Sequence, residues 1–139
     1  MANLQQRIEV EIANISKVIE EIKNIKDKKD KSTVELAGIA TFVHNFYNGI
    51  ENILKQILLE KDVSIPQIES WHKDLLELSM QNKIITKQLR NNLSEYLAFR
   101  HFLVHAYVFT LKQRQLLPLV NDIDNVFVEF KENIREYLV

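Results

Sequence analysis

The chain has 139 residues, of which 46% are hydrophobic, and its 18 basic residues nearly balance 19 acidic ones. This length supports a single domain, residues 1–139, with a real core, and the balanced charge excludes the broad positive field that non-specific nucleic-acid binding exploits, so any RNA contact must be local. The absence of cysteine excludes disulfides and thiolate chemistry.

Residues 1–16 carry charges where a secretory signal would be apolar, and no window approaches the ~18 uninterrupted apolar residues of a membrane span. We therefore expect a soluble, cytoplasmic protein that makes no contact with a membrane. Only two glycines and two prolines interrupt the chain, which favours long helices over strands joined by tight turns. The predicted fold class is all-α.

Two long helices are predicted in the N-terminal half. Isoleucines recur at spacings of four or three residues from Ile8 to Ile25, which gives a first helix one apolar stripe before the lysine-rich KDKKDKS ends it. Ser32 or Thr33 is expected to cap a second helix, whose broader apolar face ends before Pro66.

The C-terminal half predicts one short helix and two long ones. The segment PQIESWHKDLLELSM is expected to span the ends of the bundle as a short helix and to turn four apolar side chains inward, Ile68, Trp71, Leu75 and Leu76. A third long helix begins near Ile84, and the last runs from about Leu117 to the C-terminus with Pro118 in its first turn. The predicted architecture is an up-and-down bundle of four long helices plus a short connecting helix.

The third long helix carries a charge where its pattern requires an apolar side chain. Its stripe, within the otherwise apolar YLAFRHFLVHAYVF, follows Leu89, Leu93, Tyr96, Arg100, Leu103 and Tyr107. Because an unpaired buried charge is very costly, Arg100 needs an anionic partner, a water-filled cleft or a ligand. An ion pair with Glu95, Glu51 or another carboxylate would satisfy it without any function. His101 and His105 could likewise be core or interface imidazoles.

Arg100, His105 and Tyr107 together form R-x4-H-x-Y, which resembles the signature of HEPN-domain ribonuclease toxins of the HepT-like family. The segment LLELSMQNKIITKQLRNNLSEYLAF and the four-helix layout also resemble that family, so the resemblance covers the chain from about Glu35 onward and implies a HEPN-like fold. In the family a polar residue, commonly asparagine or aspartate, follows the arginine. Here that residue is His101.

The resemblance implies a metal-independent endoribonuclease toxin of a type II-like toxin–antitoxin system, with RNA (tRNA or mRNA) as substrate and no cofactor. In such an enzyme a 2′-hydroxyl attacks the neighbouring phosphate and leaves a cyclic phosphate end. Histidine titrates near neutral pH, so His105 could take the 2′-hydroxyl proton or protonate the leaving oxygen. Arg100 would hold the phosphate and stabilise the charge of the transition state. His101, one turn before His105, could be an auxiliary proton carrier or an orienting group.

Helical geometry constrains how Arg100 and His105 meet. At ~100° per residue, a five-residue step separates them by roughly 140° on an ideal helix, so they converge through the long arginine, a local distortion or a second subunit. We favour the second subunit, because HEPN ribonucleases generally act as dimers with a shared cleft. The expected assembly is a homodimer or a higher oligomer.

Tyr107 is the expected modification site. It lies seven residues after Arg100, nearly on the same helix face. In HepT-like proteins the matching tyrosine receives AMP from an MntA-like minimal nucleotidyltransferase antitoxin, which silences the nuclease. The resemblance implies the same partner and the same modification here, and the alternative is an unmodified core tyrosine.

Two other functional classes remain open. Relatives of this bundle serve as non-catalytic substrate-binding or scaffold subunits of nucleotidyltransferase complexes, and a purely structural dimerisation bundle would explain the apolar third helix. Neither class needs the intact pair of Arg100 and His105.

Weaker candidate sites favour structural interpretations. Glu69 and His72 form a single E-x-x-H motif, whereas di-iron bundles need two plus further glutamates. His101 and His105 have the spacing of helical zinc ligands but no completing ligands, so no metal is expected. The lysines of residues 23–31 could follow an RNA backbone, but interspersed aspartates favour a solvated helix end.

Overall fold

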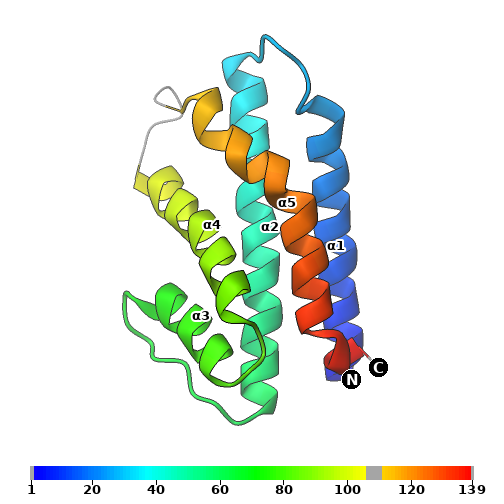
Figure 1. The fold of residues 1–139 in the computed structure, drawn as a ribbon, viewed down its shortest axis with the longest axis vertical. Helices are drawn as coiled ribbons and strands as arrows, with labels where there is room; N and C mark the ends of the chain where they lie inside the picture. Colours follow the sequence, from blue (N-terminus) through cyan, green and yellow to red (C-terminus); the bar gives the residue numbers. More distant parts are fainter. Residues whose placement is uncertain (1, 106–110, 139) are drawn as a thin grey trace.

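Long helices account for most of the chain in the computed structural model, which describes residues 2–105 and 111–138. The elements, in chain order, are α1 (Leu4–Ile25), α2 (Thr33–Glu60), α3 (Trp71–Gln81), α4 (Lys87–His105), α5 (Gln113–Asn133) and the 3-10 helix η2 (Arg135–Leu138). Figure 1 shows that the long helices α1, α2, α4 and α5 run alternately up and down. The predicted all-α bundle of four long helices and one short one is confirmed.

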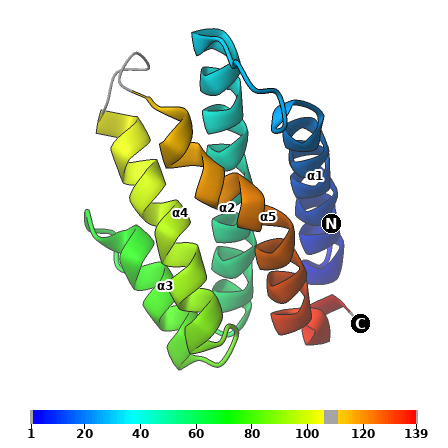
Figure 2. The same cartoon turned by 45° about the horizontal axis from the view of Figure 1, so that its top comes forward.

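The short helix α3 packs beside α4 and against α2, near the end of the bundle where α2 finishes (Figures 1 and 2). The expectation that it spans the ends of the bundle is therefore wrong. Because α3 begins only at Trp71, Ile68 precedes it and is 60% exposed instead of facing inward. Leu75 and Leu76 are buried as predicted.

Side-chain caps fix the starts of the first two helices. Asn3 and Gln6 form a reciprocal capping box at α1, and Ser32 and Glu35 form another at α2. Each box satisfies backbone N–H groups that a helix start leaves without partners. Ser32 is thus the cap of the second helix, one of the two residues that the sequence predicted.

Helix α5 begins at Gln113, four residues earlier than the sequence predicted, so Pro118 lies inside the helix and not in its first turn. A proline there removes one backbone donor and disfavours the helix. The turn before it nevertheless packs well, because Leu116 is only 2% exposed and already faces the core. Burial of this turn explains why the helix extends past the proline.

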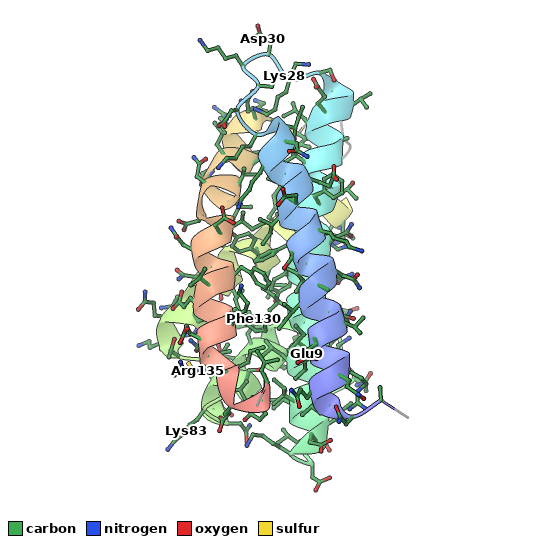
Figure 3. All side chains as sticks on the ribbon, turned by 90° about the vertical axis from the view of Figure 1, so that its right-hand side faces the viewer. Glu9, Lys28, Asp30, Lys83, Phe130 and Arg135 are labelled. Carbon is green, nitrogen blue, oxygen red and sulfur yellow. The ribbon has the colours of Figure 1, made fainter. Side chains whose placement is uncertain are left out.

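Aromatic rings link three helices at the centre of the bundle. The ring of Phe46 on α2 lies 5.2 Å from that of Tyr96 on α4 and 6.2 Å from that of Phe127 on α5, measured between centroids. Phe130 is fully buried between α5 and α1 (Figure 3). Over the described residues, no helix combines the length and the apolar character needed to cross a membrane.

Helices α1 and α2 approach closely at Gly49. A Cβ atom built on Gly49 would lie 2.6 Å from Cγ1 of Ile15, which is fully buried on α1. Gly38, on the same helix, has no neighbouring atom within 4 Å of such a Cβ. The packing of α1 on α2 therefore requires a residue without a side chain at Gly49 but not at Gly38.

We expect Gly49→Ala to lower the free energy of unfolding by about 1–3 kcal/mol, because the added methyl group forces Ile15 and the two helices apart. Gly38→Ala is the matched control and should raise it by about 0.5–1 kcal/mol through helix propensity alone. Urea unfolding followed by circular dichroism measures both changes. Equal stabilisation by the two substitutions would contradict the close approach.

Candidate active site

A cleft of about 910 Å³ lies beside α3 and α4. We call it the α3–α4 cleft. One wall is the turn before α3 and the first residues of that helix, and the other is α4. The lining residues are Glu69, Ser70, Trp71, His72 and Lys73 on the first wall and Ser94, Leu97, Ala98, Arg100, His101 and His105 on the second.

Arg100, His101 and His105 all line the α3–α4 cleft. His101 and His105 are exposed, with ring centroids 4.6 Å apart, whereas Arg100 is half-buried. Helix α4 ends at His105, so the two histidines lie at its last turn. One chain is therefore enough to bring Arg100 and His105 to a common cleft, despite their angular separation along the helix.

The guanidinium of Arg100 has no carboxylate partner among the described residues. Its Nε is buried and makes no hydrogen bond there. Of the two partners that the sequence offered, Glu95 is exposed and Glu51 pairs with a different residue. Since a guanidinium with buried donors favours an anion, Arg100 is suited to bind one from the cleft.

The partner of Glu51 is His72, a pairing that the sequence did not predict. Glu51 on α2 is 1% exposed, and its two carboxylate oxygens lie 2.8 Å and 3.0 Å from Nδ1 of His72. Its burial could have been inferred, because Glu51 follows Tyr47 by four residues and His44 by seven, along the inward face of α2. In the sequence, His72 stood out only as part of the E-x-x-H motif that it forms with Glu69.

The charges of Glu51 and Arg100 both act on the same part of α2. Burial is the main cause that lowers the pKa of His44, and the nearby Arg100 lowers it further. Glu51 raises this pKa, whereas His72 lowers it. Burial, reinforced by the carboxylate of Glu51, raises the pKa of Tyr47 well above its ordinary value. These residues form a polar cluster behind the α3–α4 cleft.

Two further features that the sequence raised are a metal site and the modification site. Among the described residues, no three His, Cys, Asp or Glu side chains are arranged to hold a metal ion. Tyr107, the predicted modification site, lies outside the described residues.

The lysines at the end of α1 make structural contacts. Lys23 lies 3.4 Å from Asp124, and Lys28 lies 2.8 Å from Glu35. Lys31 donates to backbone carbonyls at the same end of the helix. Lys28 lies at the end of the bundle where α2 begins (Figure 3). These contacts agree with a solvated helix end.

Acidification should destabilise the fold partly through His44. Its folded-state pKa is lowered, whereas the unfolded chain holds histidine at about 6.5. Just below that pH the unfolded chain protonates this histidine while the folded chain does not, so the free energy of unfolding falls as the pH falls. We expect His44→Gln to reduce this fall, measured by urea unfolding from pH 7 downward. Equal pH dependence in the variant and the wild type would contradict the assignment to His44.

Comparisons with known proteins give a family and a fold. The model of a family described as HepT-like protein matches residues 38–139. A chain in the crystal structure of a mutant MntA-HpeT toxin–antitoxin has a TM-score of 0.78 and 22% identity, with 94% of this chain and 98% of that chain covered. No curated protein matches the sequence.

Two further solved structures share the fold. A chain of a toxin–antitoxin solved with AMP-PNP has a TM-score of 0.70 and 20% identity, with 97% of this chain and 96% of that one covered. YutE, a cytosolic protein of unknown function from Bacillus subtilis, has a TM-score of 0.70 and 17% identity, with coverage of 94% and 90%. These identities are low, so the structures establish a common helical architecture. That architecture includes α1, which the family match does not reach.

Proposed function

The chain belongs to the HepT-like family, and on that premise we propose that it is a metal-independent endoribonuclease toxin of a type II-like toxin–antitoxin system. The observation that carries the proposal is the placement of Arg100, His101 and His105 on one cleft. Two of the similar solved structures are described as toxin–antitoxin proteins, one of them with MntA, which supports an MntA-like nucleotidyltransferase as partner. We propose that the protein is cytoplasmic, since the similar structure YutE is described as a cytosolic protein.

The proposed reaction needs one anion-binding group and groups that move protons. Arg100 binds the scissile phosphate through its guanidinium, and its charge stabilises the additional negative charge of the transition state. The 2′-hydroxyl oxygen attacks phosphorus, the bond to the 5′ oxygen breaks, and the products are a 2′,3′-cyclic phosphate and a 5′-hydroxyl. His105 transfers a proton in this step, and the neighbouring His101 orients it or assists the transfer. The substrate must be RNA, because DNA lacks the 2′-hydroxyl, and tRNA and mRNA are the proposed targets.

A second copy of the chain is part of the proposal. Val104 precedes His105 on α4 and is 58% exposed, and the neighbouring Phe102 and Leu103 are only half-buried. Exposed apolar side chains next to a candidate site are typical of a surface that another subunit covers. A homodimer or higher assembly would cover this surface and bring a second set of histidines close to the RNA.

Modification of Tyr107 is the proposed means of silencing. In sequence it lies two residues after His105 and seven after Arg100. An AMP group on its hydroxyl would add a bulky phosphodiester anion, which the cation of Arg100 would attract. It would compete with RNA for the guanidinium and obstruct the cleft.

Arg100→Ala and His105→Ala should each reduce RNA cleavage about 10²–10⁴-fold, because one removes the phosphate-binding cation and the other a proton carrier. Cleavage of total RNA and of tRNA is measured in excess EDTA, with circular dichroism to show that each variant is folded. Arg135→Ala, at the exposed end of η2, is the matched arginine control and should cleave as the wild type does.

Full cleavage by a folded His105→Ala or Arg100→Ala protein would remove that residue from the mechanism. A wild type that is unmodified and dimeric but cleaves no RNA would instead favour the alternative function, a non-catalytic substrate-binding or scaffold subunit of a nucleotidyltransferase complex.

Incubation with ATP and an MntA-like nucleotidyltransferase should add the mass of AMP to the wild type and abolish cleavage. Intact-mass spectrometry follows the addition, and Tyr107→Phe should gain no mass while still cleaving RNA. Tyr137→Phe is the matched control and should be modified normally. An unchanged mass of the wild type, or AMP on the Tyr107→Phe protein, would contradict modification of Tyr107.

A further inference from the structure

A third imidazole faces the α3–α4 cleft, from the wall opposite α4. His72, the second residue of α3, lines the cleft together with Arg100 and His105. Its side chain is 16% exposed, so most of the ring is held by protein while part remains accessible. The function proposed above does not use this histidine.

The carboxylate of Glu51 fixes the orientation and tautomer of His72. Both oxygens lie within 3.0 Å of Nδ1 of His72, and a carboxylate can only accept, so Nδ1 carries the hydrogen and donates it. The other ring nitrogen, Nε2, is then an acceptor whenever the ring is neutral. Because Glu51 is almost fully buried, separating it from His72 would leave an uncompensated charge in the core, which keeps the pair together.

This arrangement is suited to a general base. An imidazole that accepts a proton at Nε2 becomes an imidazolium, and a buried carboxylate at Nδ1 stabilises the cation and holds the ring in place. His105, by contrast, is exposed at the end of α4, and no carboxylate contacts it among the described residues. His72 and His105 thus differ in surroundings, as the members of an acid–base pair do.

We propose that His72 is the general base of RNA cleavage, with Glu51 as its positioning residue and His105 as the general acid. This inference rests on the proposed ribonuclease function. The proton of the 2′-hydroxyl passes to Nε2 of His72 as the oxygen–phosphorus bond forms. A proton on His105 passes to the 5′ oxygen as its bond to phosphorus breaks. The chain then supplies a complete acid–base pair itself, and a dimer would contain two such pairs.

The pair of Glu51 and His72 also ties α3 to α2, so a purely structural role must be separated from a chemical one. The chain offers a matched control in the ion pair of Glu77 with Arg90. It ties α3 to α4, and neither residue lines the α3–α4 cleft. Glu77→Gln removes an attachment of α3 without touching the site.

The experiment compares RNA cleavage by the wild type, His72→Ala, Glu51→Gln and Glu77→Gln. We expect His72→Ala to lower kcat about 10²–10⁴-fold with little change in KM. Added imidazole should restore part of the activity by entering the space left by the ring. Glu51→Gln should give a smaller loss, because the amide oxygen still accepts from Nδ1 but carries no charge. Glu77→Gln should cleave as the wild type does.

Binding is measured separately from cleavage. Trp71 is the only tryptophan in the chain, lines the cleft, and lies 3.6 Å from the ring of His72 between centroids. Its fluorescence should therefore report binding of a 2′-O-methyl RNA that cannot be cleaved. His72→Ala should bind this RNA as the wild type does, since the proposed role of His72 is in the chemical step. If His72→Ala fails to fold, His72→Asn and Glu51→Gln take its place in the comparison.

A substrate that needs no general acid distinguishes the two histidines. Uridine 3′-(p-nitrophenyl phosphate) releases a stable phenolate, so His105→Ala should regain activity on it while His72→Ala should not. Recovery of His72→Ala on this ester would overturn its assignment as the base. Undiminished cleavage by a folded His72→Ala, or an equal loss in Glu77→Gln without rescue by imidazole, would overturn the inference alone. A wild type without ribonuclease activity would overturn both this inference and the proposed function.

Discussion

The carboxylate of Glu51 lies in the interior of the bundle, and its need for a partner determines much of the surrounding structure. An ionised group at 1% exposure is tolerated only when it is paired and hydrogen-bonded. Its partner, His72, belongs to the short helix α3, which non-helical segments separate from α2 and α4 along the chain. The pair therefore attaches α3 to α2 and helps to hold Trp71, His72 and the preceding turn opposite α4, as one wall of the α3–α4 cleft.

Charge is distributed unevenly around that cleft. The half-buried Arg100 and the buried Glu51 both act on His44 and Tyr47 of α2, so the polar groups behind the cleft feel charges of opposite sign. At its mouth, the last turn of α4 presents two exposed histidines. An anion that enters meets a cation whose Nε has no partner among the described residues, and two exposed imidazoles. This is the electrostatic arrangement that cleavage of a phosphodiester would use.

The sequence predicted those parts of the structure that depend on local pattern. Helical periodicity and the Ser32 cap indicated the long helices, and Arg100 was recognised as a site residue because it interrupts an apolar stripe. Features that depend on packing between helices were not predictable in this way. The start of α5 was misplaced because the burial of Leu116 outweighs the effect of Pro118. The pairing of Glu51 with His72 joins residues 21 apart in sequence on different helices, and nothing in either segment specifies the other.

The central claim is that the α3–α4 cleft breaks RNA by attack of a 2′-hydroxyl, and the chemistry of the product ends tests it most directly. A labelled RNA oligonucleotide and a DNA strand of the same sequence are incubated with the wild type in excess EDTA, and the ends are identified by mass spectrometry. The account predicts that only the RNA is cut, leaving a 2′,3′-cyclic phosphate and a 5′-hydroxyl. Cleavage of the DNA strand, or RNA fragments that end in a 3′-hydroxyl and a 5′-phosphate, would contradict it.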